Sequence, residues 1–276
     1  MKPRPRGREP RWPAPAGPRV PRDRRCVHSN PVALETALLD ARAAGCGKFI
    51  MLGDITGYGY DPKRTLELAR KNFDVVLMGN HDSACVGLEP EWDVKMNNHY
   101  LLDRKARELL TDEERAWLRA RGYTHEEAGF VCTHGDFTDP SAWNYTSDCE
   151  KAELNFYTRD ERLMFCGHTH EAAVWEMTGN GNCRQKAAEI LRRPAQDAES
   201  VTLALDQTSR YTVNVGSVGY PRFDLCSTYC IYDAGAQTIT IRRLPFDFNT
   251  YIAEMLGSEY RLEDWLRPYL AAAQAE

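Results

Sequence analysis

Short apolar runs alternate with longer amphipathic stretches along the chain. Asn30 and Pro31 form an N-cap and a first-turn proline, which predict a helix that ends near Ala44. A second helix is predicted over residues 62–71. Other apolar runs are too short for helices and are typical of buried strands, and four of them are 48–52, 75–78, 130–133 and 163–166. This alternation of strands and helices indicates an α/β fold.

Each of these four runs stops at a loop that carries Asp, Asn or His. The loops are Gly53-Asp54, Gly79-Asn80-His81-Asp82, His134-Gly135 and Gly167-His168-Thr169-His170. In layered α/β folds the functional site lies just beyond the carboxyl ends of the strands, which hold the loops in rigid positions. The four loops therefore predict one shared site.

The remaining elements follow from weaker patterns. Residues 100–121 are charged and helical in character, and residues 178–200 are polar and predict a loop with a short helical piece. Further strands are predicted at 201–205 and 211–215, a hairpin at 228–232 and 238–242, and a C-terminal helix at 258–274.

Residues 1–25 differ from the rest of the chain. They contain seven prolines and eight arginines, with Trp12 and Val20 as the only large apolar side chains after Met1. Such a segment cannot bury enough apolar surface to offset the entropy lost on ordering. We therefore expect a disordered Arg/Pro-rich tail at 1–25 and a globular domain over 26–276.

Charge divides the chain at the same place. The whole chain carries −5 and residues 1–25 carry +7, so the remainder carries −12. An acidic body argues against a general nucleic-acid binder and suits a protein that gathers carboxylates around cations.

No apolar stretch approaches the ~18 residues of a membrane-spanning helix. Nine widely spaced cysteines without a CxxC pair favour reduced thiols, so we expect a cytoplasmic protein.

Most of the histidines lie where metal ligands would be expected. Five of the seven are in the strand-end loops or just before the first helix: His28, His81, His134, His168 and His170. A single loop histidine is more often structural, but five such residues beside Asp54 and Asn80 favour a metal site. Imidazole, carboxylate and carboxamide ligands without a cysteine pair differ from the usual structural zinc set. They suit an open site for Mn, with Fe, Zn, Ni or Co as alternatives.

These motifs resemble the signature of the calcineurin-like metallophosphoesterases, in order and at suitable spacing. The late loop Asn214-Val215-Gly216-Ser217 also resembles that of the small bacterial phosphodiesterase subgroup. The resemblance implies an α/β fold of two facing mixed β-sheets flanked by helices. It also implies that a hydroxide activated by two divalent metal ions hydrolyses phosphomonoesters or phosphodiesters of small phosphorylated substrates.

The resemblance further assigns roles to single residues. Asp54 would bridge both ions. The other ligands form two sets, Asn80, His134 and His168 for one ion, and His28 and His170 for the other. His81 would stand near the leaving group without binding metal, oriented by Asp82. Residues in position to line the pocket are Tyr58, Tyr60, Trp143, Tyr145 and Arg222, although aromatic residues at such places more often serve packing.

The match is weakest at its start. The family opens with an apolar strand that ends in Asp-x-His, but here Cys26 stands at the Asp position before His28. Asp23 is spaced too far from His28 to replace it, and Cys26 is either a thiolate ligand for zinc or a thiol that binds nothing. The Arg- and Pro-rich residues before Cys26 predict that the first strand is missing. We therefore expect a weakened first metal site, and an altered reading frame or misassigned start upstream of residue 26 would explain both losses.

Two other functions stay open. A non-catalytic or weakly active regulatory relative would keep the fold without filling both metal sites. A nuclease would need clustered cations to bind the phosphate backbone, and the acidic body argues against it. Metal stoichiometry and turnover of a chromogenic phosphodiester separate the regulatory relative from an enzyme. Salt-dependent DNA binding would indicate a nuclease.

Overall fold

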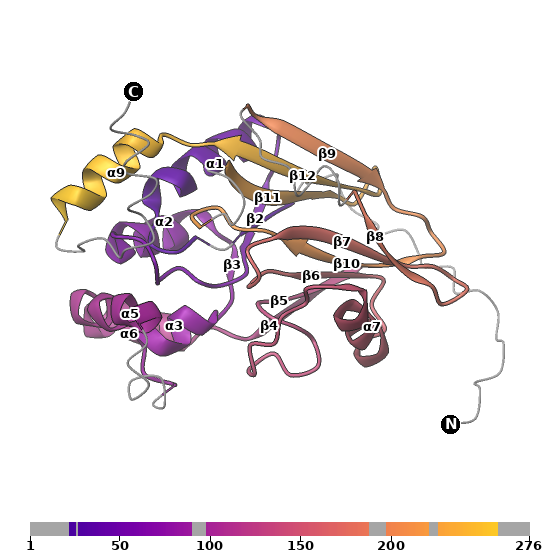
Figure 1. The fold of residues 1–276 in the computed structure, drawn as a ribbon, viewed down its shortest axis with the longest axis horizontal. Helices are drawn as coiled ribbons and strands as arrows, with labels where there is room; N and C mark the ends of the chain where they lie inside the picture. The colour runs from indigo at the N-terminus through magenta and orange to yellow at the C-terminus, as the bar shows by residue number, and fades with distance from the viewer. Residues whose placement is uncertain (1–21, 26, 90–97, 188–196, 221–225, 259–276) are drawn as a thin grey trace.

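Two six-stranded mixed sheets face each other in the computed structural model, which describes residues 22–25, 27–89, 98–187, 197–220 and 226–258 (Figure 1). The first sheet has the order β3 (Val75–Val76), β2 (Lys48–Met51), β1 (Arg22–Arg25), β11 (Cys226–Asp233), β12 (Thr238–Pro245) and β9 (Glu199–Ala204). The second has the order β4 (Thr124–Glu127), β5 (Phe130–Thr133), β6 (Leu163–Cys166), β10 (Arg210–Val215), β7 (Ala172–Met177) and β8 (Cys183–Lys186). The predicted fold class is confirmed.

Helices cover the outer sides of the two sheets (Figure 1). They are α1 (Pro31–Ala43), α2 (Pro62–Asn72), α3 (Asn80–Cys85), α5 (Asn98–Leu109), α6 (Asp112–Arg119), α7 (Cys149–Thr158) and α9 (Phe248–Gly257). Helices α1, α2 and α9 lie on the side of the first sheet and α7 lies against the second, while α3, α5 and α6 pack together beside them. None of the helices within the described residues is long and apolar enough to cross a membrane.

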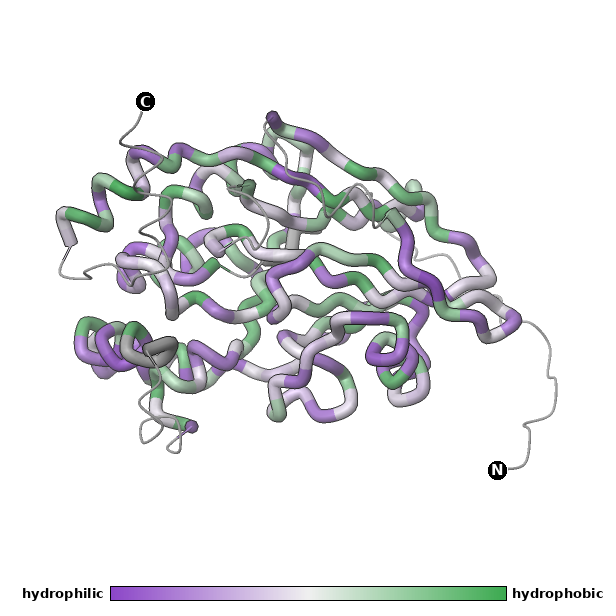
Figure 2. Tube along the Cα trace, viewed as in Figure 1, coloured by the Kyte–Doolittle hydropathy of each residue, from purple (hydrophilic) through white to green (hydrophobic). Residues whose placement is uncertain are grey.

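Side chains that alternate between the two faces of the central strands explain why the sheets pack against each other on one face and against helices on the other. In β2 and the residue after it, Ile50 and Leu52 enter the apolar core between the sheets together with Phe165 of β6. Phe49 and Met51 enter the core beneath α1 and α2. Successive side chains of a strand point to opposite faces, so one strand serves two cores. Figure 2 shows apolar positions recurring along the strands of both sheets next to hydrophilic ones.

Most of the predicted elements are present. Asn30 caps α1 as expected, with its side-chain oxygen 3.0 Å from Ala33 N. The two late strands pair as an antiparallel hairpin, β11 with β12. The prediction of a loop over 178–200 is wrong at β8 and at the start of β9, and the strands β4 and β7 were also missed. Nearly all of the helix predicted at 258–274 lies outside the described residues.

The first strand is present, which corrects the prediction that it is missing. β1 pairs in parallel with β2 and antiparallel with β11, so Arg22–Arg25 occupy the middle of the first sheet and do not belong to a disordered tail. The ladder is made by backbone groups, and neighbours on both sides satisfy them whatever the side chains prefer. Residues 1–21 and Cys26 lie outside the described residues, so the expected tail and the role of Cys26 stay predictions.

This correction predicts how truncation will act. Deleting residues 1–25 removes the strand that joins β2 to β11, and we expect the melting temperature to fall by roughly 10 °C or more, since each lost kcal/mol costs about 2–4 °C in a chain of this size. Deleting residues 1–21 is the matched control, because it leaves β1 in place. Thermal unfolding followed by circular dichroism compares the two, and equal melting temperatures would show that β1 adds nothing to stability.

Candidate metal centre

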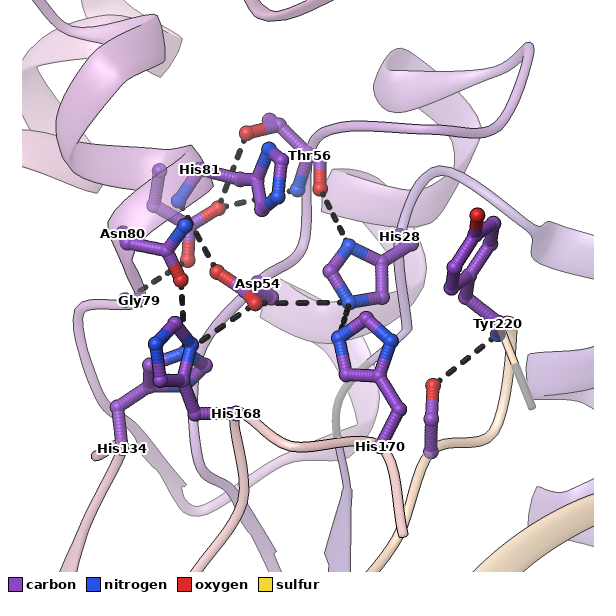
Figure 3. Close-up of polar contacts among 12 residues, drawn as sticks. His28, Asp54, Thr56, Gly79, Asn80, His81, His134, His168, His170 and Tyr220 are labelled. Atoms are coloured by element: carbon purple, nitrogen blue, oxygen red, sulfur yellow. Dashed lines mark hydrogen bonds and ion pairs between the residues drawn. The ribbon is translucent and has the colours of Figure 1, made fainter. Parts of the chain in front are cut away.

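All eight predicted site residues meet at one edge of the two sheets. Figure 3 labels each of them except Asp82. His28 follows β1, Asp54 follows β2, and Asn80 to Asp82 form the first turn of α3. His134 follows β5, and His168 and His170 follow β6. Each of these side chains is at most 7% exposed. The strand-end pattern thus predicted which residues come together, while their roles stay predictions.

One cluster is built around His134. Its Nε2 atom lies 3.1 Å from Asp54 Oδ2, 3.1 Å from Asn80 Oδ1 and 3.1 Å from His168 Nδ1. These are atoms that bind cations, and Asp54 Oδ2 is buried without a hydrogen-bond partner. A buried carboxylate oxygen left in this way is costly unless a cation or proton compensates it.

Backbone carbonyls fix which ring nitrogens face this cluster. His134 Nδ1 lies 2.8 Å from Leu52 O, and His168 Nε2 lies 2.8 Å from Trp143 O. A carbonyl can only accept a hydrogen bond, so these nitrogens are the N–H donors. In the neutral rings the opposite nitrogens, His134 Nε2 and His168 Nδ1, then carry lone pairs. Metal-ligating histidines are oriented by this same contact.

A second cluster is built around His28 in the same way. His28 Nδ1 donates to Thr56 O at 3.2 Å, which turns Nε2 toward His170 Nε2 at 2.8 Å and Asp54 Oδ2 at 3.5 Å. Ligand atoms of His28, Asp54 and His81 all lie within 4.8 Å of one another. The ligand atoms of Asp54, His134 and His168 form a second group within the same distance. Asp54 is common to both clusters, which fits a carboxylate shared by two ions.

Electrostatics keep the cluster in the state that binds cations. Burial lowers the pKa of His28 to about 3 and that of His168 to about 3, so both rings are neutral at physiological pH. Burial opposes ionisation of Asp54, but the contact with His134 outweighs it and holds the pKa of Asp54 well below the usual range. One buried carboxylate beside the neutral imidazoles of His28 and His168 is a suitable donor set for divalent transition metals.

Backbone strain is concentrated at the same residues. His28, Asp54, His168 and His170 have φ values of 51°, 57°, 67° and 63°. Left-handed conformations of residues other than glycine cost on the order of 1–3 kcal/mol each and persist where the surroundings hold them. The fold therefore maintains an arrangement of ligands that the local sequence does not favour.

Asp103, and not Asp82, holds the ring of His81. His81 Nδ1 lies 2.8 Å from Asp103 Oδ2, whereas the Asp82 carboxylate accepts from the backbone N–H groups of Ile55, Thr56 and Gly79. The prediction that Asp82 orients His81 is therefore wrong. Asp82 instead ties the loop that carries Asp54 to the start of α3. Burial disfavours the charged ring of His81, but Asp103, Asp54 and Asp82 together raise its pKa to about 9.

Sequence reasoning missed Asp103 although one signal was available. Asp103, Ala106 and Leu110 are spaced as one face of α5 and the turn after it, and all three are at most 1% exposed. A carboxylate in the apolar stripe of an amphipathic helix needs a buried partner. No spacing rule, however, links it to His81 on another helix.

Comparison with known proteins agrees with this geometry. The model of the calcineurin-like phosphoesterase superfamily domain matches residues 26–237. The chain belongs to this superfamily. The matched range starts two residues before His28 and includes every residue of the two clusters.

Similar proteins match most of the length of the chain. The crystal structure of a metallophosphoesterase from Sphaerobacter thermophilus is 29% identical, with a TM-score of 0.72, and the similarity covers 92% of this chain and 99% of that one. A hypothetical protein from Pyrococcus horikoshii, 17% identical with a TM-score of 0.63 over 86% of this chain and 92% of that one, shares the fold. An uncharacterized protein of Methanocaldococcus jannaschii is 28% identical over 87% of this chain and 92% of its own length.

Gly57 supplies a test of how closely His81 is placed. Its φ is +85°, and a Cβ atom there would lie 2.5 Å from His81 Nδ1. Gly129 has a φ of +98°, but a Cβ atom added at Gly129 would have no other atom within 4 Å. Both Gly→Ala changes strain the backbone, but only Gly57→Ala displaces His81. We expect Gly57→Ala to lower phosphoester turnover by about 10²-fold, and Gly129→Ala to leave it unchanged. Equal losses in both variants would show that backbone strain, and not His81, is responsible.

Proposed function

We propose that this protein hydrolyses phosphomonoesters or phosphodiesters at a site for two divalent metal ions. The observation that carries the proposal is the direction of the imidazole rings. His28, His134 and His168 each give one ring nitrogen to a backbone carbonyl and turn the other toward Asp54 or a neighbouring histidine. Buried lone pairs that converge in this way are costly unless a proton or a cation lies between them, and a divalent metal ion can bind several of them at once.

The donor atoms support two positions for metal. His134, His168 and Asn80 would hold one ion, and His28 and His170 the other, with Asp54 between them. When bound, such ions supply positive charge to the phosphate oxygens and lower the pKa of water. Mn suits this oxygen- and imidazole-rich set, with Fe, Zn, Ni or Co as alternatives. A cytoplasmic location is part of the same proposal.

In this proposal His81 serves the leaving group. It lies in the first turn of α3, with its ring 5.2 Å from that of His28, and Asp103 fixes the ring through Nδ1. In hydrolysis a water oxygen adds to phosphorus, the ester P–O bond breaks, and the departing oxygen takes up a proton. A ring held by Asp103 presents Nε2 for that proton transfer.

A weakly active regulatory relative is the second candidate. The sequence favours it at one point, because Cys26 stands where the family pattern has Asp. The complete set around His134 would then hold metal while the set around His28 stays partly filled.

Turnover of matched substrates tests the proposal. The full chain is stripped with a chelator, and hydrolysis of p-nitrophenyl phosphate and bis-p-nitrophenyl phosphate is followed with and without added Mn. We expect release of p-nitrophenol only with Mn, and the ratio of the two rates separates a phosphatase from a phosphodiesterase. Bound Mn without turnover of either ester would favour the regulatory relative, and an absence of bound Mn would overturn both.

A further inference from the structure

The ring of Tyr145 lies flat on a predicted metal ligand. Its centroid is 4.3 Å from that of His168 and the two planes differ by 15°. Tyr145 is nevertheless 51% exposed. Because the imidazole covers one face of the phenol ring, the exposure leaves the other face open beside the metal centre.

Two buried neighbours hold Tyr145 in this exposed position. Trp143 donates from Nε1 to Glu89 Oε1 at 3.0 Å, and its carbonyl accepts from His168. Thr146 is buried, and its hydroxyl accepts from Asn155 Nδ2 at 3.0 Å. A large aromatic side chain is thus presented to solvent from a segment anchored on both sides. Such a fixed ring loses little entropy when a ligand packs on it.

A second aromatic pair stands beside the other cluster. Tyr58 and Tyr220 are stacked, with centroids 4.1 Å apart and planes within 14°, and the ring of Tyr58 is 4.5 Å from that of His81. Tyr220 also meets the ring of His170 at 5.3 Å. Aromatic surfaces therefore lie next to both histidine clusters. A bare inorganic or short alkyl phosphate would make no use of them.

We infer that Tyr145 is a stacking platform for a planar aromatic group of the substrate, and that this residue selects phosphoesters that carry a nucleobase or an aryl group. The inference rests on the proposed function, since it presumes that the phosphoryl group lies between the two histidine clusters. In this arrangement a planar group would cover the open face of Tyr145, and its phosphoryl group would extend past the edge of the ring toward the two clusters. Stacking on one aromatic side chain stabilises a bound base by about 1–3 kcal/mol and does not depend on which base it is.

Binding of phosphonates tests the platform without any turnover, because their C–P bond is not hydrolysed. Calorimetric titration of the Mn-loaded full chain compares phenylphosphonate, a nucleoside phosphonate and methylphosphonate. We expect the aromatic ligands to bind ~10-fold more tightly than methylphosphonate. Tyr145→Ala should lower the affinity for the two aromatic ligands by ~10-fold relative to that for methylphosphonate, and Tyr145→Phe should keep the preference. Tyr157→Ala, which changes a tyrosine on α7 that is 76% exposed, is the matched control and should keep it as well.

The outcomes separate the inference from the function on which it rests. A preference for aromatic ligands that survives in Tyr145→Ala, or an equal loss of affinity for all three ligands, overturns the platform alone. Binding of none of the three to the Mn-loaded chain counts against the phosphoryl site itself. Tighter binding of the nucleoside ligand than of phenylphosphonate identifies a nucleobase as the group that stacks.

Discussion

Asp54→Asn is expected to lower phosphoester turnover by roughly 10³-fold or more and to weaken metal binding at both positions. The substitution keeps the size of the side chain and removes its charge. Oδ2 of Asp54 lies 3.1 Å from His134 Nε2 and 3.5 Å from His28 Nε2, so it is the anionic oxygen common to both clusters. A loss of about 4 kcal/mol of transition-state stabilisation corresponds to that factor.

Metal content and rate are measured on the same preparations of this variant. Asp160→Asn is the matched control, because it removes one carboxylate from an exposed loop after α7. It should retain metal and rate. Loss of only one ion in Asp54→Asn would mean that the carboxylate belongs to a single site, and an unchanged rate would remove Asp54 from the chemistry.

His81→Ala is expected to keep both metal ions and to lose about 10²–10⁴-fold in turnover, the usual contribution of a positioned proton donor. This result depends on His81 not being a ligand, although its ring lies within ligand distance of His28 and Asp54. Loss of one metal equivalent from His81→Ala would assign it to the first metal site and end its role as proton donor.

Asp103→Asn tests the role of His81 by changing the carboxylate that contacts its ring. Asp103 is a positioning residue, because it contacts His81 at 2.8 Å and acts through that ring. We expect Asp103→Asn to lower kcat by up to about 10²-fold with little change in KM. In the double variant with His81→Ala the loss of Asp103 should cost nothing more, since residues that act as one unit are not additive. A further loss in the double variant would indicate that Asp103 only stabilises the fold.

The sequence predicts the site better than it predicts the sheets around it. Asp54, Asn80, His134 and His168 are found because each follows a short apolar run, and strand ends at one edge of a sheet bring such residues together. The carbonyls of Leu52, Thr56 and Trp143 orient the rings of His134, His28 and His168. Backbone groups leave no mark in the sequence, so only the structure identifies them.

Two of the missed strands, β1 and β4, have a common physical cause. Arg22–Arg25 lack the residue types that favour strands, yet β2 and β11 satisfy their backbone on both sides. Thr124–Glu127 form β4 with an exposed, polar pattern at the edge of the second sheet. In both segments, pairing with partners distant in the sequence outweighs local propensity. The helix predicted over 31–44 succeeds because its N-cap and proline are local signals.

Titration of Mn into the metal-free full chain tests the central claim most directly. Bound metal per chain and hydrolysis of bis-p-nitrophenyl phosphate are measured on each sample. We predict that the chain binds up to two equivalents and that turnover rises with occupancy, while Asp54→Asn stays inactive throughout. Undiminished turnover in the chelated, metal-free chain, or two bound equivalents without hydrolysis of any phosphoester, would contradict a metal-dependent phosphoesterase.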